Sequence, residues 1–293
     1  MKKYFAMLLA GMMAVSLVAC GGSSAASTSA EVPAEAEAEA PAEEEVTEEE
    51  TTEAEAPAET TEETAEMTTV EAGVLHMATN AAFPPYEMIS DNDGFEGIDV
   101  EIATEIARKL GLELVVDDME FGSVITSVQS GKSDIAMAGL TVTEERKQNV
   151  DFTTSYATGI QVIIVPEDSD ILTVDDLAND KMIGVQDGTT GYIYCSDDYG
   201  EDHITSYTNG AMAIEALKGG KVDAVVIDNE PARAFVAAND GLKILDTEYI
   251  VENYAIGVSK DNPGLCKAVN DALTELIADG TVQMIVDKYI TAE

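Results

Sequence analysis

Apolar residues recur along residues 71–293 at two spacings, which predict strands and helices in alternation. Val74–Thr79 and residues 112–116 are short apolar runs of the kind that form strands. Between them a helix is predicted by apolar residues at helical spacing followed by a glycine: Ile98, Ile102, Ile106, Leu110 and Gly111. The alternation continues to closing helices over residues 264–278 and 281–290. The fold class is therefore α/β with largely parallel sheets.

One sequence of features occurs twice: a helix, a Gly-Lys turn, an aspartate and a strand. The copies span residues 124–138 and 213–227. Two lobes of similar construction explain this echo, and a chance match between two ordinary αβ units is the alternative. The polar residues Thr141 and Asp228 follow the two strands. Since ligands on open α/β sheets bind beyond the carboxyl ends of strands, two such lobes predict a ligand cleft between them.

The first twenty residues are set apart from the folded pattern. Lys2 and Lys3 precede an apolar run over residues 5–18, which is short for a bilayer span and is typical of a secretory signal. The run ends in Leu17-Val18-Ala19-Cys20, which resembles a bacterial lipobox. We therefore expect residues 1–20 to be a lipoprotein signal peptide, with a plain signal peptide as the alternative. Lipid on Cys20 would anchor the mature chain to the cell membrane, because two acyl chains give stable attachment.

Residues 21–70 hold Ser, Thr, Ala, Gly, Pro, Val, Glu and a single Met, without lysine or arginine. Such a segment buries too little apolar surface to offset its chain entropy, so a disordered acidic linker is predicted. Over the whole chain, 57 acidic residues against 15 basic ones give a formal net charge of −42. Nucleic acid is therefore excluded as a partner.

The cysteines and histidines of the body form no pattern that indicates a metal site. Cys195 and Cys266 are taken as unpaired, buried thiols, and their spacing neither supports nor excludes a disulfide. His76 and His203 fall in apolar or mixed stretches without a cluster at metal-ligand spacing. We expect no metal and no cofactor.

The first candidate anion site is the segment from Gly139 to Arg146, which follows a predicted strand. Thr143 stands where it can cap a helix that starts at Glu144. A helix N-terminus and an arginine together suit a small carboxylate, because the guanidinium offers a planar fork. The other interpretation pairs Arg146 with a neighbouring carboxylate on a solvated helix.

A second candidate anion site is Gly188-Thr189-Thr190-Gly191, between a predicted strand and a helix. Its amides and hydroxyls suit a carboxylate, and a plain strand-to-helix turn is the alternative. Asp228 closes a buried strand, where a carboxylate suits an ammonium group. Its alternative role is to cap the helix that follows.

Taken together, these segments resemble the family 3 solute-binding proteins of amino-acid ABC importers, from about residue 74 to residue 290. The resemblance rests on five segments in order: residues 78–87 (ATNAAFPPYE), 97–103 (GIDVEIA), 139–146 (GLTVTEER), 150–153 (VDFT) and 188–190 (GTT). It implies a two-lobed, type II periplasmic-binding-protein-like fold with two chain crossovers, near residues 156–161 and 254–257. Lobe 1 would comprise residues 71–157 and 256–293, and lobe 2 residues 158–255.

The resemblance also implies a role for each site residue. Arg146 would clamp the ligand α-carboxylate, assisted by the backbone amides of Thr141 and Thr190. Asp228, the Gly139 carbonyl and the Thr141 hydroxyl would hold the α-ammonium group. A monomer that hands its ligand to an ABC permease and ATPase is implied.

Side-chain selectivity is where the sequence departs from familiar members. Phe83 and Phe121 correspond to aromatic walls, although each taken singly is equally typical of a core. Asn80 stands where members that bind basic amino acids have aspartate, so a neutral polar side chain is accommodated. Gln186 and Asp187 occupy further side-chain positions, and Asp187 would restore a negative charge. Glutamine, cystine and arginine stay open as ligands.

Three functions are compared on these residues. A transport-binding protein accounts for the lipobox, the linker and all the family segments. An enzyme of the dehydratase kind would draw on Asp187, Asp228 and Glu230 as acid–base groups, but no nucleophile motif or cofactor fingerprint accompanies them. A sensor domain fused to a signalling protein would need a membrane segment, and none follows Ile290. We therefore expect a binding protein that is not an enzyme, and a separate sensor as its partner stays open.

Overall fold

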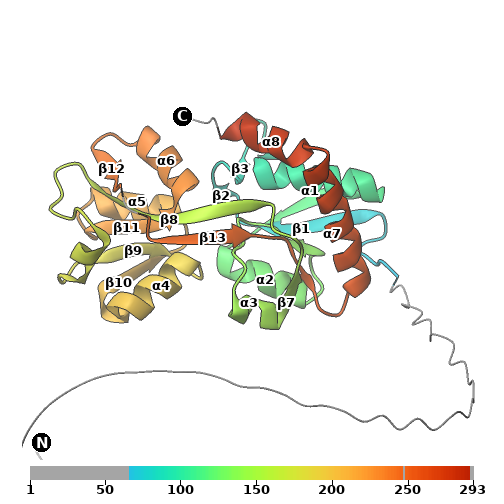
Figure 1. Ribbon diagram of the computed structural model, residues 1–293, viewed down its shortest axis with the longest axis horizontal. Coiled ribbons are helices and arrows are strands. Elements are labelled where there is room, and N and C mark those ends of the chain that lie inside the picture. The colour runs from blue at the N-terminus through green and yellow to red at the C-terminus, as the bar shows by residue number, and fades with distance from the viewer. Residues whose placement is uncertain (1–65, 247, 291–293) are drawn as a thin grey trace, which may run out of the picture. The chain divides into compact units, whose positions relative to one another are not determined.

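The computed structural model describes residues 66–246 and 248–290, all within one compact unit that begins at Thr60. The predicted signal peptide, the lipid site at Cys20 and most of the predicted linker lie outside the described residues. Two separate sheets organise the unit, and each is the centre of one lobe (Figure 1).

Lobe 1 is built on a five-stranded sheet with the strand order β5-β1-β6-β14-β7. The strands are β1 (Val74–Thr79), β5 (Glu113–Asp118), β6 (Ile135–Ala136), β7 (Val150–Phe152) and β14 (Gly257–Ser259). The helices are α1 (Ile98–Leu110), α2 (Phe121–Gln129), α3 (Glu144–Asn149), α7 (Pro263–Ala278) and α8 (Thr281–Tyr289). Helix α1 ends as predicted, because Gly111 adopts the left-handed conformation at φ 71°.

Lobe 2 is built on a six-stranded sheet with the order β10-β9-β11-β8-β12, and β13 also pairs with β8. The strands are β8 (Ala157–Pro166), β9 (Ile183–Gln186), β10 (Ile204–Tyr207), β11 (Ala224–Asp228), β12 (Leu242–Ile244) and β13 (Ile250–Tyr254). The helices are α4 (Thr190–Tyr199), α5 (Gly210–Lys218) and α6 (Asn229–Ala238), with short 3-10 turns η1 (Val174–Ala178) and η2 (Glu201–His203).

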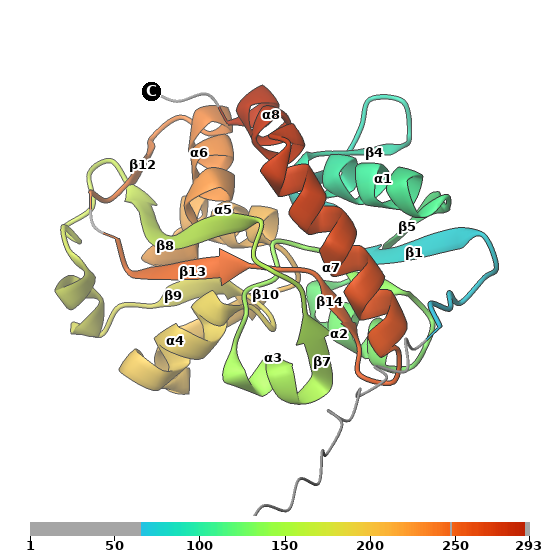
Figure 2. The ribbon, with the colours of Figure 1, turned by 45° about the vertical axis from the view of Figure 1, so that its right-hand side comes forward.

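The chain enters lobe 2 through β8 and leaves it through β13, which lie side by side as an antiparallel pair (Figure 2). Their register runs from Ala157 opposite Tyr254 to Gln161 opposite Ile250. The pair forms the connection between the lobes that the sequence predicts.

The repeated sequence feature has a repeated structural role. In lobe 1, the Asp134 carboxylate accepts a hydrogen bond from the His76 N–H at 2.8 Å, and the Asp134 N–H donates to the His76 carbonyl. In lobe 2, the Asp223 carboxylate accepts from the Met182 N–H at 2.8 Å, and the Asp223 N–H donates to the Met182 carbonyl. Each aspartate therefore fixes the start of a central strand, and the two lobes are of similar construction.

Two features of the sheets differ from the prediction. The sheets are mixed rather than largely parallel, because β14 pairs antiparallel with β6 and β7, and β8 pairs antiparallel with β11 and β12. A third, three-stranded sheet that the sequence did not predict is formed by β2 (Ala82–Phe83), β3 (Glu87–Ile89) and β4 (Phe95–Glu96). Strands of two or three residues are too short to show an alternating pattern in the sequence.

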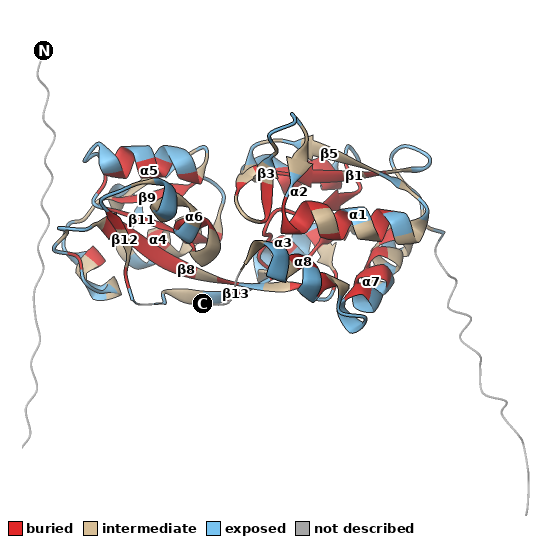
Figure 3. Cartoon of the chain, turned by 90° about the horizontal axis from the view of Figure 1, so that it is seen from above, coloured by how far each residue is buried: buried red, intermediate tan, exposed pale blue. Residues whose placement is uncertain are grey.

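The core follows the predicted apolar positions. Ile98, Ile102 and Ile106 are fully buried on the inner face of α1, and β8 is buried continuously from Gln161 to Val165 (Figure 3). Before residue 71 the chain already contacts this body, because the Val70 N–H donates to Asp134 and the Thr68 carbonyl accepts from Asn262. The folded body thus begins before the boundary that composition predicts.

Three further properties of the described residues concern membrane crossing, metal binding and the state of the cysteines. Across residues 66–246 and 248–290, no helix has the length and apolar content that a bilayer crossing requires. In the same part of the chain, His, Cys, Asp and Glu side chains form no group of three that would hold a metal ion. Cys195 and Cys266 are both free thiols; Cys195 is buried as predicted, whereas Cys266 is half-buried.

Candidate ligand-binding site

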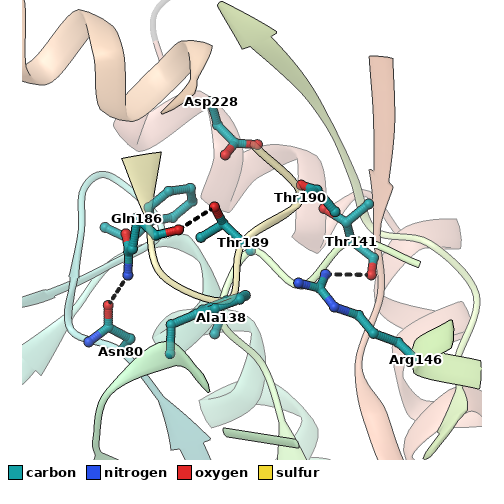
Figure 4. Close-up of a pocket in the computed structure, with 11 residues that line it drawn as sticks. Asn80, Ala138, Thr141, Arg146, Gln186, Thr189, Thr190 and Asp228 are labelled. Atoms are coloured by element: carbon teal, nitrogen blue, oxygen red, sulfur yellow. Dashed lines mark hydrogen bonds between the residues drawn. The ribbon is translucent and has the colours of Figure 1, made fainter. Parts of the chain in front are cut away.

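A pocket lies where loops of the two lobes meet, with about 300 Å³ of space not filled by protein atoms (Figure 4). The predicted binding residues other than Asp187 line it, and Ala138 is the one addition: Asn80, Phe83, Phe121, Ala138, Gly139, Thr141, Arg146, Gln186, Thr189, Thr190 and Asp228. The structure therefore brings together residues that are up to 148 positions apart in the chain, from Asn80 to Asp228.

Arg146 lies at the junction between the lobes. Helix α3 begins as predicted, because the Thr143 hydroxyl accepts a hydrogen bond from the Arg146 N–H. The guanidinium donates to the Thr141 carbonyl at 2.8 Å and to the Gly188 carbonyl of lobe 2 at 3.2 Å, and it lies 5.3 Å from the centre of the Phe121 ring. The side chain is therefore buried in the pocket and not on a solvated helix face.

The pKa of Arg146 is lowered by burial, and nearby carboxylates oppose that shift. Arginine stays charged in proteins, so burial leaves a cation with little water around it. A guanidinium has five N–H groups, which leaves several beyond the two protein contacts. Such a group is strongly attractive to a carboxylate that enters the pocket.

The second candidate anion site is also a helix start. Gly188 has a positive φ of 73°, and the Thr189 hydroxyl caps α4 by accepting from the Tyr192 N–H. Thr190 is the first residue of α4 and is 3% exposed at the pocket wall. The first N–H groups of a helix lack intrahelical acceptors. The segment is thus both an ordinary strand-to-helix turn and part of the pocket lining.

Asp228 is the last residue of β11, and it brings a carboxylate from lobe 2 to the pocket (Figure 4). Its carboxylate accepts a hydrogen bond from the Tyr254 hydroxyl and makes no capping bond to α6, so the capping alternative is wrong. Burial, and after it the charge of Glu252, raises the pKa of Asp228 to about 7, although hydrogen bonds from Tyr254 and Gln161 oppose the shift. A bound ammonium group would stabilise the charged form.

Gly139 and Thr141 present the edge of lobe 1 to the pocket. Gly139 has φ +52°, and a Cβ atom at this position would lie 2.7 Å from the Phe83 ring, so a larger residue is excluded. Its N–H donates to the Asp99 carboxylate at 2.9 Å. The Thr141 hydroxyl donates to Glu252 at 3.1 Å. Sequence reasoning missed Glu252, because a single glutamate in a predicted strand carries no motif.

Two further buried acids lie behind Gly139. Asp99 also accepts a hydrogen bond from the Tyr156 hydroxyl at 2.8 Å, and burial raises the pKa of Asp99 to about 6. Glu87 is fully buried beside it, and burial followed by the charge of Asp99 raises the pKa of Glu87 well above its usual value. A hydrogen bond between the two acids also raises the pKa of Glu87 and lowers that of Asp99.

Another part of the pocket wall is formed by two amide side chains, Asn80 from lobe 1 and Gln186 from lobe 2. The Gln186 amide donates to the Asn80 side-chain oxygen at 2.9 Å, and the Asn80 amide donates to the Met119 carbonyl at 2.8 Å. Asp187 is exposed and Glu230 accepts from the neighbouring Asn229, and neither lines the pocket. Of the three carboxylates proposed as acid–base groups of an enzyme, Asp228 is the one that lines this pocket.

This fold and pocket define a two-lobed solute-binding protein. The chain belongs to the bacterial extracellular solute-binding proteins, family 3, whose family model matches residues 75–292. The resemblance found in the sequence and the type II periplasmic-binding-protein fold are both confirmed.

Relatives with known roles bind amino acids for ABC transporters. ABC transporter arginine-binding protein 1 of Escherichia coli (strain K12) is 31% identical over 220 residues, which is 73% of this chain and 90% of that protein. L-cystine-binding protein TcyJ of the same strain is 29% identical over 226 residues, 76% of this chain and 85% of that protein. The solved structure of an ancestral arginine-binding protein bound to glutamine matches with 37% identity and a TM-score of 0.72, covering 76% of this chain and 100% of that one.

Proposed function

We propose that this chain captures a free L-amino acid outside the cytoplasm and delivers it to an ABC permease and its ATPase. The observation that carries the proposal is the placement of Arg146 from lobe 1 and Asp228 from lobe 2 on one pocket. A free amino acid carries a carboxylate and an ammonium group on one carbon atom, and this pocket offers one partner of opposite charge to each.

The α-carboxylate is assigned to the Arg146 guanidinium and to the backbone amides of Thr141 and Thr190, next to Thr189. The α-ammonium group is assigned to Asp228, the Gly139 carbonyl and the Thr141 hydroxyl. Burial supports this assignment, because Arg146, Thr141, Thr190 and Asp228 are each at most 8% exposed, where charge-assisted hydrogen bonds are strong.

The side chain of the ligand is assigned to the space between Phe83, Phe121, Asn80 and Gln186. Both amides donate and accept, and Asp228 is the carboxylate among the lining residues. A neutral polar side chain such as that of glutamine therefore fits without leaving a buried charge unpaired. Relatives named for arginine, cystine and glutamine make these three the ligands to test first. A cationic side chain would depend on the aromatic faces instead.

Capture is proposed to proceed by lobe closure about β8 and β13. The hydrogen bonds from Arg146 to Gly188 and from Gln186 to Asn80 join the lobes in the described state. A ligand that contacts both lobes shifts the population towards this closed form, which the permease then reads. The protein acts as a monomer and as a binding protein without enzymatic turnover.

The decisive experiment is calorimetric titration with the individual amino acids. The chain from residue 21 onward is unfolded and refolded first, so that carried-over ligand is removed. Tight one-to-one binding of one or a few L-amino acids is expected, and mass spectrometry should recover the ligand unchanged. Silence for all twenty amino acids and cystine up to millimolar concentration would contradict the proposal.

We also propose that lipid on Cys20 anchors the mature chain to the outer face of the cell membrane. The support is the lipobox-like segment and the spacer that follows it. Expression of the full chain in a bacterium should place it in the membrane fraction, with a lipid-modified N-terminal peptide in the mass spectrum. Cys20→Ala should release it, and a membrane fraction unaffected by that change would contradict the anchor.

A further inference from the structure

Glu252 is a buried acid beside the pocket that the proposed function does not use. It lies in β13 and is 3% exposed. One carboxylate oxygen accepts hydrogen bonds from the Thr141 hydroxyl at 3.1 Å and from the Gln161 amide at 3.0 Å. A charged group at this depth is costly unless it is paired, so its presence beside a binding site calls for a role.

The contact between Glu252 and Thr141 is held by the backbone on both sides. Thr141 forms a bridge with Tyr254, the Val142 N–H donates to the Asn253 carbonyl, and the Ala255 N–H donates to the Leu140 carbonyl. The edge of lobe 1 therefore runs beside the end of β13 as a short antiparallel pair. These bonds join lobe 1 to the crossover strand β13 and not to the rest of lobe 2. Glu252 therefore stays beside Thr141 whatever the position of the rest of lobe 2.

The direction of the hydroxyl bond decides what Thr141 offers to a ligand. A threonine hydroxyl has one hydrogen and two acceptor lone pairs. The carboxylate of Glu252 takes that hydrogen, so the Thr141 oxygen faces the pocket as an acceptor. An ammonium group donates and cannot accept, which makes it the matching ligand group.

The charges around Glu252 favour the same group. Its charge contributes to the raised pKa of Asp228 and opposes the lowering of the pKa of Arg146, so all three lie within electrostatic reach. Burial, and after it the charge of Glu252, raises the pKa of the Tyr194 hydroxyl to about 12. The two carboxylates and the one guanidinium leave an excess of negative charge, which favours a cationic group.

We propose that Glu252 is a positioning residue for the α-ammonium group: it holds the Thr141 hydroxyl as an acceptor and places a second negative charge behind Asp228. This inference rests on the proposed function, because it assigns a further determinant to the same site. It predicts that the pocket selects amino acids over carboxylic acids of the same shape.

The test compares each amino acid with its analogue that lacks the α-amino group. L-Glutamine is paired with 5-amino-5-oxopentanoate, and L-arginine with 5-guanidinopentanoate; the pair whose amino acid the wild type binds is used. Glu252→Gln keeps the shape of the side chain and removes its charge. It should weaken amino-acid binding by about tenfold to a hundredfold, which is typical of a lost charge-assisted contact, and leave the analogue within about twofold.

Glu248→Gln is the matched control, because Glu248 is exposed just before β13 and undergoes the same chemical change. Its binding should equal that of the wild type. Equal weakening of both ligands by Glu252→Gln, or no weakening, would overturn the inference and leave Glu252 with a structural role. Failure of the wild type to bind any amino acid would instead contradict the proposed function.

A double-mutant cycle decides the matter if the analogue binds too weakly to measure. Thr141→Val removes the hydroxyl that Glu252 orients. In that background Glu252→Gln should weaken amino-acid binding at least threefold less than it does in the wild type, because the shared contact is already lost. Equal effects in the two backgrounds would overturn the orienting role.

Discussion

The two lobes share a construction but bring opposite chemistry to the pocket. Each has three parallel central strands and an aspartate that binds the backbone where two of them meet, buried Asp134 in lobe 1 and exposed Asp223 in lobe 2. Lobe 1 contributes the cation, Arg146, together with both aromatic side chains, whereas lobe 2 contributes the anion, Asp228. Neither lobe alone offers both charges that an amino acid requires. Under the proposed function, this difference between the lobes is what would couple recognition to closure.

Removing the cation of lobe 1 should have the largest effect on binding. Arg146→Ala should abolish binding of every amino acid tested, by more than about a hundredfold, because the α-carboxylate is common to all of them. Arg108→Ala is the control, since Arg108 is exposed on α1 and pairs with Glu105. Calorimetry on both variants checks the prediction. Binding by Arg146→Ala within threefold of wild type would show that the carboxylate lies elsewhere.

The anion of lobe 2 should make binding depend on pH. The pKa of Asp228 in the ligand-free protein is about 7, raised by burial, and a bound ammonium group lowers it. Affinity should therefore be constant above pH 8 and fall by up to about tenfold per unit as the pH drops below 7, because Asp228 must lose its proton to bind. Asp228→Asn should bind weakly at all pH values and lose this dependence. Titrations between pH 5 and pH 9 measure both.

The amide pair that joins the lobes should set side-chain preference with a smaller effect. Asn80 donates to the Met119 carbonyl and accepts from the Gln186 amide, and Asn80→Asp places a negative charge between these two groups. The ratio of affinities for L-arginine and L-glutamine should rise by about tenfold, as expected for one charge-assisted contact. Asn149→Asp, on the exposed end of α3, should leave the ratio unchanged. An unchanged ratio in Asn80→Asp would mean that residue 80 does not face the ligand side chain.

The acids behind lobe 1 should affect stability more than binding. The folded-state pKa of Glu87 is raised above its unfolded value, so its contribution to stability is present below the unfolded pKa and is lost as the pH rises towards the folded pKa. Glu87→Gln, which keeps the shape without the titrating proton, should raise Tm at pH 8 by about 3 °C and change it little at pH 4.5.

Glu96→Gln in the exposed strand β4 provides the control for this change. Thermal unfolding followed by circular dichroism at both pH values measures it. A lower Tm for Glu87→Gln at pH 8 would show that the native hydrogen bond to Asp99 outweighs the cost of keeping Glu87 protonated.

Local pattern predicted helix α1 together with its ends, and it predicted the closing helices to within one residue. Helix α1 begins and ends where the spacing of Ile98 to Leu110 and the glycine at 111 place it, because these signals act within one turn of helix. The three-stranded sheet from β2 to β4 was not predicted, since strands of two or three residues carry no periodicity. The antiparallel pairing of β8 with β11 and that of β14 with β6 were also missed, because strand direction is set by contacts far along the chain.

The sequence by itself determined the α/β class, the family and the residues that line the pocket apart from Ala138, because ordered motifs at fixed spacing carry that information. The tertiary structure alone decided which further groups surround them. Glu252 and Asp99 acquired their places beside Thr141 and Gly139 through chain crossings that bring positions 111 and 40 residues apart into contact. The hydrogen bonds of a buried acid depend on those crossings, and no local pattern encodes them.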